Sequence, residues 1–387
     1  MKIEKRPYDK NKSFVNFKSK TKDENYNAVI DKIKTVLSDK NKIRKLDKDK
    51  KKIINYLNKD LIENKRTDRP KFQLTPNITK EISLLEEKDI LRYLLHRYRY
   101  DIYPLILQMD DYPPYLQIEP TSFCNFRCVF CFQSNKDFSK RSSGYMGHMK
   151  LETFKSVVDQ AEGNVEFISL ASRGEPLICR EIDKMLLYAS GKFLNLKINT
   201  NASILNEKRA HAILQSDVRT LVFSADAADK KLYSKLRVNG KLDKVVANIT
   251  QFKKIKEKHY PKAKIITRVS GVKVSRQQKF SDMEKFWKDM VDQVAFVDYC
   301  PWENVYASKI NKLTKPCSEL WRRMYVWWDG KANPCEVDYR SDLSPGYLSK
   351  NNNLSKLWLS PIYRSLRKKH LHSDRSATKP CDRCKVI

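Results

Sequence analysis

Three cysteines within eight positions constrain this chain more than any other feature of its sequence. They are Cys124, Cys128 and Cys131, spaced C-x3-C-x2-C, and they follow an apolar segment, 115–118, that favours a β-strand. Iron–sulfur sites of the four-thiolate type use one cysteine for each iron. Three thiolates can therefore hold three irons of a 4Fe–4S cube and leave the fourth iron open to chelate a substrate or cofactor. The alternatives are a zinc site or three unrelated buried thiols, although three cysteines this close rarely arise from core packing.

The overall composition favours a globular cytoplasmic protein. A length of 387 residues predicts two to three domains, and a hydrophobic content of 41% is enough for a sizeable core. No apolar run approaches the roughly 20 residues that span a bilayer, and the lysine-rich N-terminus lacks the apolar core of a signal peptide. In a cytoplasmic protein the nine cysteines are better explained as metal ligands and free thiols than as disulfides.

The net charge of +31 raises the possibility of a nucleic-acid partner. The positive excess is spread along the chain: residues 1–100 carry 28 Lys and Arg against 15 Asp and Glu, and residues 309–387 carry 17 against 7. Much of it is scattered lysine without aromatic residues at stacking intervals. We therefore favour solvated helix faces over a nucleic-acid surface, while a basic cleft would also suit a phosphorylated or nucleotide-linked small substrate.

The N-terminal part of the chain predicts a basic helical extension over residues 1–105. Its first twenty or so residues are polar, lysine-rich and aperiodic, so we expect them to be disordered. Apolar residues then recur at helical intervals, which predicts helices over 26–37, 43–62 and 80–96. The extension contains no cysteine.

An alternation of strands and helices follows and defines a second domain, 106–308. We predict strands at 115–118, 165–170, 194–199, 220–224, 265–270 and 294–299, separated by helices at 151–161, 181–190, 206–215, 242–255 and 280–290. Six such units imply an α/β fold with a parallel sheet and right-handed crossovers. In barrel-type sheets the functional sites form at the carboxyl ends of the strands. The three cysteines follow the first strand and so lie where a site is expected.

The cysteine spacing, with the aromatic Phe130 before the last cysteine, resembles the radical SAM enzyme family. The resemblance implies a partial (β/α)6 TIM-like barrel with a 4Fe–4S cluster at its mouth. The open iron of that cluster would bind the amino and carboxylate groups of S-adenosylmethionine. One electron from the cluster would then cleave the cofactor and release a 5′-deoxyadenosyl radical that abstracts a substrate hydrogen.

The second strand ends at a motif that strengthens this resemblance. Gly174, Glu175 and Pro176 match the family's Gly-Glu-Pro motif, which helps to hold the methionyl amino group. Arg173 precedes the motif and is a candidate catalytic residue that could pair with a carboxylate or phosphate of the substrate. The alternative for Arg173 is a structural ion pair with Glu175 or with a helix end.

Polar residues at the ends of later strands are implied to contact the cofactor. Asn201 lies in a segment that resembles the family's Thr-Asn-Gly turn, with alanine in place of the glycine. By the same resemblance, Ser224, Arg237 and Asp226 would contact the cofactor, Ser224 and Arg237 at its carboxylate. Arg268, on the fifth predicted strand, is a further basic residue that we expect to face the mouth.

A third domain, 309–387, contains the remaining cysteines. An Asp-Gly turn, Asp329-Gly330, predicts a hairpin that brings Cys317 and Cys335 together, and Cys381 and Cys384 can complete four thiolates. Zinc would fit such a set. The segment, however, resembles the SPASM extension of radical SAM enzymes, which implies one fully ligated auxiliary 4Fe–4S cluster. Two cysteines are left over: Cys179 is predicted to be a buried thiol, and Cys300 is either a packed thiol or a second candidate catalytic residue.

The resemblance gives a reaction class and leaves the substrate open. We expect an oxidoreductase-like radical SAM enzyme that receives electrons from a flavodoxin- or ferredoxin-type donor. The leading hypothesis is oxidation or epimerisation of a sugar, a cyclitol or a nucleotide-linked sugar. The alternatives are maturation of a ribosomally made peptide and, third, modification of RNA.

Overall fold

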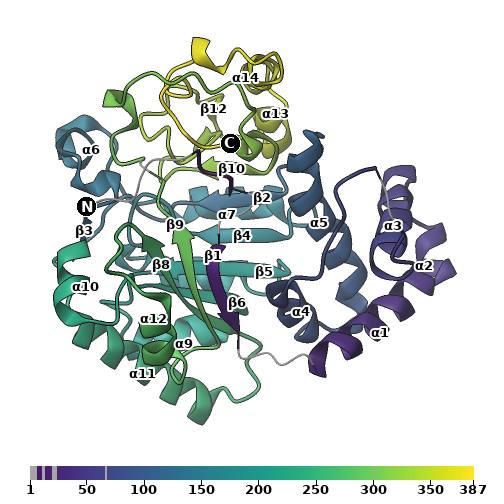
Figure 1. Cartoon of the computed structure of the whole chain (residues 1–387), viewed down its shortest axis with the longest axis horizontal. Helices are drawn as coiled ribbons and strands as arrows, with labels where there is room; N and C mark the ends of the chain where they lie inside the picture. The colour runs from purple at the N-terminus through teal and green to yellow at the C-terminus, as the bar shows by residue number, and fades with distance from the viewer. Residues whose placement is uncertain (1–6, 11–13, 20–23, 66–67, 301) are drawn as a thin grey trace. The chain divides into compact units, whose positions relative to one another are not determined.

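The computed structural model describes residues 7–10, 14–19, 24–65, 68–300 and 302–387. The chain forms two compact units (Figure 1). The larger unit combines residues 1–18 with residues 111–387, and the smaller unit contains residues 19–110. Among the described helices, none has the length and apolar character needed to cross a membrane.

A ten-stranded sheet organises the larger unit, in the order β1-β9-β8-β6-β5-β4-β2-β10-β11-β12. Its central strands are mutually parallel and alternate with helices, as predicted. They are β2 (Tyr115–Ile118), β4 (Phe167–Leu170), β5 (Asn195–Thr200), β6 (Val218–Ser224), β8 (Ile266–Lys273) and β9 (Gln293–Asp298). Every residue of β2 and β4 is buried, which is typical of parallel strands covered on both faces.

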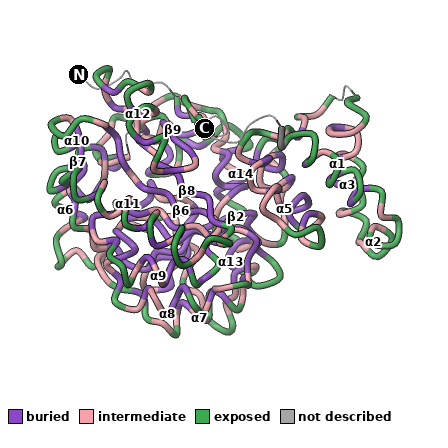
Figure 2. The backbone as a smooth tube through the Cα atoms, turned by 90° about the horizontal axis from the view of Figure 1, so that it is seen from below, coloured by how far each residue is buried: buried purple, intermediate pink, exposed green. Residues whose placement is uncertain are grey.

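Amphipathic helices connect these strands and cover the sheet. They are α7 (Leu151–Ala161), α8 (Ile182–Ala189), α9 (Glu207–Gln215), α10 (Lys230–Leu236), α11 (Leu242–His259) and α12 (Phe280–Trp287). In α7 the buried residues are Phe154, Val157, Val158 and Ala161, the spacing of one helix face. Figure 2 shows the same arrangement, with buried strands inside and exposed outer helix surfaces. Because all six strands run the same way, their carboxyl ends meet at one edge of the sheet.

The C-terminal part extends this sheet from β2. Strand β10 (Arg323–Val326) pairs in parallel with β2, so that Met324 lies opposite Leu116, and β11 (Lys331–Asn333) and β12 (Gly346–Tyr347) continue it. The predicted Asp-Gly turn joins β10 to β11, with Gly330 at a φ of +84°. Helices α13 (Leu354–Trp358) and α14 (Pro361–Leu371) follow. The sequence did not predict that the hairpin would join the barrel sheet.

The start of the chain is ordered where the structure describes it, so our prediction of disorder is wrong for these residues. Strand β1 (Phe14–Ser19) lies at the sheet edge beside β9. Tyr8 pairs with Val386, and its backbone N–H donates to the carbonyl of Lys385 (2.8 Å). The partners of both segments lie far away in the sequence, so the local lysine-rich composition gave no sign of the pairing. The other residues of this prediction lie outside the described ranges.

The smaller unit is helical, as predicted. It contains α1 (Glu24–Ser38), α2 (Lys40–Arg44), α3 (Lys48–Leu61), α4 (Pro76–Ser83) and α5 (Glu87–Ile106). The helix predicted over 43–62 is divided by Asp47, whose side chain accepts a hydrogen bond from the Lys50 N–H and begins α3. The helix predicted over 80–96 is likewise divided, between α4 and α5.

Candidate metal centres and cofactor site

The first three cysteines lie in the loop after β2, at the carboxyl edge of the parallel strands. Cys128 is buried with Phe126 and Phe130, and Cys124 and Cys131 pack against the same apolar cluster. The Cys131 N–H donates to the carbonyl of Cys128 (3.1 Å), which closes the turn between the last two cysteines. The structure thus brings the three thiols together, with Phe130 beside them.

Burial raises the pKa of all three thiols, to about 12 for Cys124. Two donors offset part of this effect. The backbone N–H of Phe126 donates to Cys124 Sγ (3.4 Å), and the guanidinium of Arg237 donates to Cys128 Sγ (3.8 Å). A metal that binds here has to displace the thiol protons, and these donors would stabilise the resulting negative charge on sulfur. An all-sulfur donor set in an apolar loop fits an iron–sulfur cluster.

A glycine in the loop after β4 allows that loop to press against the cysteine loop. A Cβ atom on Gly174 would lie 2.2 Å from the carbonyl oxygen of Thr121 and 2.6 Å from that of Phe123. The neighbouring Glu175 N–H donates to the same Phe123 carbonyl (2.9 Å). Any side chain at position 174 would therefore separate the two loops.

Glu175 is buried behind this contact, and its carboxylate accepts three hydrogen bonds. The donors are the Leu177 N–H (3.2 Å), the Thr200 hydroxyl (2.6 Å) and the Asn201 N–H (2.7 Å). Burial raises the pKa of Glu175 to about 7, although these hydrogen bonds act in the opposite direction. The first of them caps a short 3-10 helix that begins at Pro176. A carboxylate has about four acceptor positions, so Glu175 retains capacity for an ammonium group.

The turn after β5 joins the same network. Asn201 Nδ2 donates to Asn125 Oδ1 (3.0 Å), and Asn125 Nδ2 donates to the Ser203 hydroxyl (2.8 Å). Asn125 stands between the first two cysteines, so the turn is tied directly to the cysteine loop. Ala202 adopts a φ of +59°, and the left-handed geometry of the turn is therefore present even though alanine replaces glycine.

Arg237 and Asp226 form a buried ion pair beside the cysteines. Asp226 also accepts the Val272 N–H (2.7 Å), which fixes the pair to the end of β8. The Arg237 guanidinium lies 5.6 Å from the centre of the Phe130 ring. The Asp226 carboxylate thus holds the Arg237 guanidinium beside the cysteines, and its contact with the cofactor stays a prediction. Ser224 ends β6 and is half-buried at the carboxyl edge, as predicted for a residue at the mouth.

Arg268 does not lie at the mouth, contrary to our expectation. Strand β8 continues to Lys273, so Arg268 is near its beginning and not near its carboxyl end. Its Nε donates to Gln293 Oε1 (2.8 Å), and the rings of Phe14 and Phe17 lie 5.2 Å and 5.4 Å from its guanidinium. Strand β1 therefore covers this arginine.

The guanidinium of Arg173 is occupied by hydrogen bonds within the protein, which argues against a catalytic role. It is 2% exposed and forms a two-pronged pair with Glu119, with Nε–Oε2 at 2.7 Å and Nη2–Oε1 at 2.6 Å. Its third nitrogen donates to the carbonyl of Tyr339 (3.1 Å), and the guanidinium stacks 4.1 Å from the Trp327 ring. The structural ion pair is therefore real, but its partner is Glu119 and not Glu175. It joins the end of β2 to the C-terminal domain.

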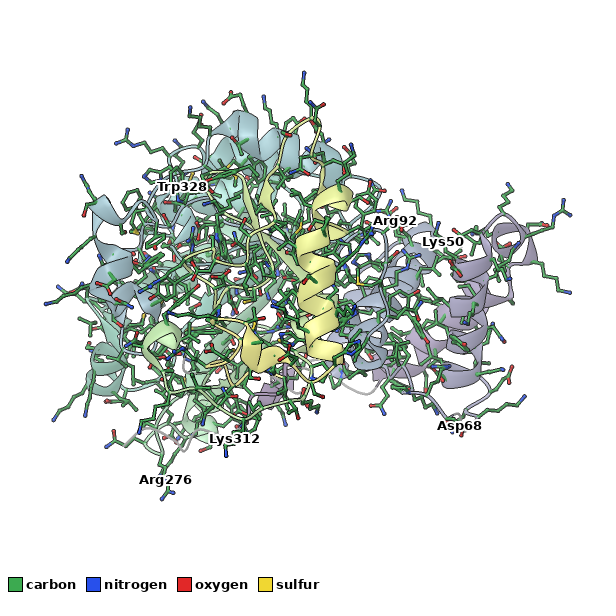
Figure 3. The ribbon with its side chains drawn as sticks, turned by 90° about the horizontal axis from the view of Figure 1, so that it is seen from above. Lys50, Asp68, Arg92, Arg276, Lys312 and Trp328 are labelled. Carbon is green, nitrogen blue, oxygen red and sulfur yellow. The ribbon has the colours of Figure 1, made fainter. Side chains whose placement is uncertain are left out.

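A tryptophan makes a second connection between these two parts of the larger unit. Trp328, labelled in Figure 3, packs its ring against Gly147, where a Cβ atom would lie 2.4 Å from the ring. Its indole N–H donates to the carbonyl of Tyr145 (3.1 Å). Gly147 in turn exchanges hydrogen bonds with Ser122, two residues before Cys124. The C-terminal hairpin thus supports the cysteine loop.

The four C-terminal cysteines line one cavity, as predicted. The cavity is lined by Cys317, Cys335, Cys381 and Cys384. Its volume is about 500 Å³, which includes the solvent space at its open side. Burial raises the pKa of all four thiols, to about 12 for Cys317, and for the first three the neighbouring thiols add to the effect. Four sulfurs on one cavity can complete the coordination of a metal cluster.

Two basic side chains of the C-terminal domain shape this cavity. Arg375 donates to the backbone carbonyls of Cys381 (3.2 Å) and Cys384 (2.9 Å), which holds the final turn. His370 Nδ1 accepts the backbone N–H of Cys317 (3.1 Å). Burial lowers the pKa of His370 to about 3, so the ring is neutral and suited to accept this hydrogen bond. Within the described residues, no three His, Cys, Asp or Glu side chains converge closely enough to hold a single metal ion.

An aromatic core cluster lies between the two cysteine groups. It contains Phe132, Phe138, Tyr306 and Tyr339, and Cys131 packs against it together with three of the C-terminal cysteines, Cys317, Cys335 and Cys384. Cys300 belongs to this cluster and is 4% exposed, so it is a packed thiol beside the auxiliary group. Cys179 is buried elsewhere, as predicted.

Comparisons with known families agree with this architecture. Residues 118–266 match the radical SAM superfamily, and residues 317–385 match SPASM, an iron–sulfur cluster-binding domain. The chain therefore belongs to the radical SAM superfamily of enzymes and carries a C-terminal SPASM domain.

Individual relatives are distant. GTP 3′,8-cyclase of Listeria welshimeri is 26% identical over 192 residues, which cover 48% of this chain and 54% of that protein. The chain spans about half the length of the curated relatives it matches. Among solved structures, Streptococcus suis SuiB bound to precursor peptide SuiA has a TM-score of 0.51 at 16% identity, covering 87% of both chains. Native anSMEcpe with bound AdoMet and Cp18Cys peptide has a TM-score of 0.50 at 16% identity, covering 70% of this chain and 87% of that one.

Sequence reasoning missed two residues of these sites, Glu119 and Lys10. Glu119 directly follows β2, where the parallel-sheet argument already places mouth residues, so its position was a usable signal. Lys10 lines the auxiliary cavity from the start of the chain, and nothing in its local sequence distinguished it from the other lysines.

Proposed function

We propose that Cys124, Cys128 and Cys131 hold a 4Fe–4S cluster that binds S-adenosylmethionine, and that the four C-terminal cysteines hold one auxiliary 4Fe–4S cluster. The observation that carries this proposal is the division of the seven cysteines into a group of three packed on one apolar cluster after β2 and a group of four that lines one cavity. Three thiolates leave an iron free for the cofactor, whereas four complete the coordination.

The residues around the first group have roles that follow from their contacts. Glu175 offers a buried acceptor for the methionyl ammonium, and Asp226 holds Arg237 where its charge can meet the cofactor carboxylate. Gly174 keeps this acceptor against the cysteine loop, and Asn201 ties the turn to that loop. With the clusters and cofactor bound, the cofactor would supply a hydrogen-abstracting radical and the auxiliary cluster would serve as a one-electron acceptor. The substrate would then lose one hydrogen atom, one electron and, to solvent, one proton, which is two hydrogens in all.

We assign the chain an oxidative role on a small sugar, cyclitol or nucleotide-linked sugar. One observation supports a nucleotide-linked small substrate: the curated relatives are named for GTP, a nucleotide. Epimerisation requires a hydrogen donor at the substrate. Cys300, the candidate donor, is packed in the aromatic core cluster, which favours oxidation.

Peptide maturation is the second candidate. It is favoured by the two structural neighbours whose titles name a bound peptide, SuiA and Cp18Cys. A flavodoxin- or ferredoxin-type protein would serve as electron donor in either case, and cytoplasmic location stays a prediction.

An anaerobic substrate screen tests the proposal. Reconstituted protein with dithionite and S-adenosylmethionine should form 5′-deoxyadenosine, faster when the true substrate is present. Deuterated sugars, nucleotide sugars and short peptides are then compared for deuterium transfer into 5′-deoxyadenosine, and the unlabelled compounds for a product two mass units lighter. Transfer from a peptide and from none of the sugars would replace the leading substrate class by the second. No 5′-deoxyadenosine from protein that contains iron would refute the radical reaction.

A further inference from the structure

The start of the chain is attached to the residues that follow the last auxiliary cysteine. Tyr8 accepts the Ile387 N–H (2.9 Å) and donates to the Lys385 carbonyl (2.8 Å), and the Lys10 N–H donates to the Ile387 carbonyl (3.4 Å). Lys385 directly follows Cys384. We call residues 7–10 the N-terminal segment. Its backbone pairing places Lys10 at the wall of the auxiliary cavity.

The Lys10 side chain lines the same cavity as the four cysteines. It is 11% exposed, and its ammonium lies 3.1 Å from Glu336 Oε1. The rings of Tyr8 and Trp302 lie 5.5 Å from the ammonium and shield it further from water. Charges shielded in this way interact more strongly than charges in water. Arg375 also lies at the cavity, where its two terminal nitrogens donate to backbone carbonyls.

We infer that Lys10 is a positioning residue whose ammonium sets the reduction potential of the auxiliary cluster. The N-terminal segment, which places Lys10 there, is therefore part of that site. The inference rests on the proposed assignment of a cluster to Cys317, Cys335, Cys381 and Cys384. One-electron reduction adds a negative charge to a cluster, and a buried ammonium nearby stabilises that charge. Net local charge and exposure are among the quantities that set cluster potentials. Lys10 therefore raises the reduction potential and favours electron uptake from the substrate.

The test is a redox titration followed by electron paramagnetic resonance. It uses the full chain with Cys124, Cys128 and Cys131 all changed to alanine, so that only the auxiliary cluster contributes. In this background Lys10→Met should lower the equilibrium constant for reduction at least tenfold, which is about 59 mV for a one-electron couple. Lys10→Arg should keep the parent potential within half of that shift. Lys18→Met is the matched control, because Lys18 is exposed and pairs only loosely with Glu284 (3.9 Å); it should shift nothing.

Variants of Glu336 show whether Lys10 acts on the reduction potential through its charge or through its packing. Glu336→Gln alone should raise the potential, because it removes the opposite charge. The double variant Lys10→Met/Glu336→Gln should return towards the parent value, since the two changes cancel in charge. Equal potentials in the Lys10→Met variant and its parent, or equal shifts in the single and double variants, would overturn the inference. Absence of iron from the triple-cysteine background would instead refute the cluster assignment, and the role of Lys10 with it.

Discussion

The two cysteine groups differ in how the chain builds them. The first group lies in one loop after β2, and its neighbours follow the next strands in order: Glu175 after β4 and Asn201 after β5. The auxiliary group is assembled from a hairpin, the final turn and the N-terminal segment. The residues of a site built from consecutive β/α loops can be recognised in the sequence. The contribution of the N-terminal segment to the auxiliary group can be recognised only in the fold.

The difference extends to their chemistry. The first group has three thiols beside the buried carboxylate of Glu175 and the buried guanidinium of Arg237. These two groups suit the binding of a charged cofactor. The second offers four thiols around a cavity whose neutral His370 and carbonyl-bound Arg375 stabilise the loops. We therefore expect changes near the first group to affect cofactor cleavage, and changes near the second to affect oxidation of the substrate.

Gly174→Ala should have the largest effect and should act on the first group alone. The new Cβ cannot fit against the Thr121 carbonyl at 2.2 Å, so the Glu175 loop must move away from the cysteines. We expect 5′-deoxyadenosine formation to fall by about a hundredfold or more, which corresponds to about 2.7 kcal/mol, with auxiliary iron retained.

Gly191→Ala is the control for this variant. Gly191 has a positive φ, which Gly174 does not have, and an added Cβ at Gly191 meets nothing within 4 Å. It should cost about 1 kcal/mol of folding stability and leave cofactor cleavage unchanged. Normal cleavage by Gly174→Ala would show that the loop contact is dispensable.

Arg173→Met should destabilise both regions together, because the Arg173–Glu119 pair connects them. Removing one partner leaves a buried charge uncompensated, which costs about 3–5 kcal/mol. The urea concentration at the midpoint of unfolding should therefore be lower than in the wild type. In the double variant Arg173→Met/Glu119→Gln much of the loss should be recovered, since neither charge remains. A single variant as stable as the wild type would mean that the pair does not hold the domains together.

Glu175 should give the protein without its clusters a specific pH dependence. Its folded pKa of about 7 lies above the unfolded value of 4.5, because burial disfavours the charged form. The folded state therefore binds more protons between these values, and the free energy of unfolding should fall as the pH rises from 4.5 to 7, by about 3 kcal/mol. Glu175→Gln should flatten this part of the profile. An unchanged slope in the variant would assign the titration to another group.

How much of each site could be predicted depended on how the chain brings its residues together. The motif around Glu175 acts through backbone contacts that its own loop geometry determines, so residue type and spacing were sufficient. Lys10 and Glu336 are 326 residues apart, and Arg173 and Glu119 are 54 apart, so only the folded sheet brings each pair together. Arg268 was misplaced because β8 extends three residues beyond its predicted end, which moves the mouth away from it.

The most direct test of the division of roles compares Cys131→Ala with Cys335→Ala under dithionite. Iron content, circular dichroism and 5′-deoxyadenosine are measured on the same anaerobic samples, because loss of a ligand can destabilise a metal-supported domain. The account predicts that Cys131→Ala retains auxiliary iron and forms no 5′-deoxyadenosine, whereas folded Cys335→Ala forms it without releasing oxidised product. Cofactor cleavage by Cys131→Ala, or normal product formation by Cys335→Ala, would contradict the account.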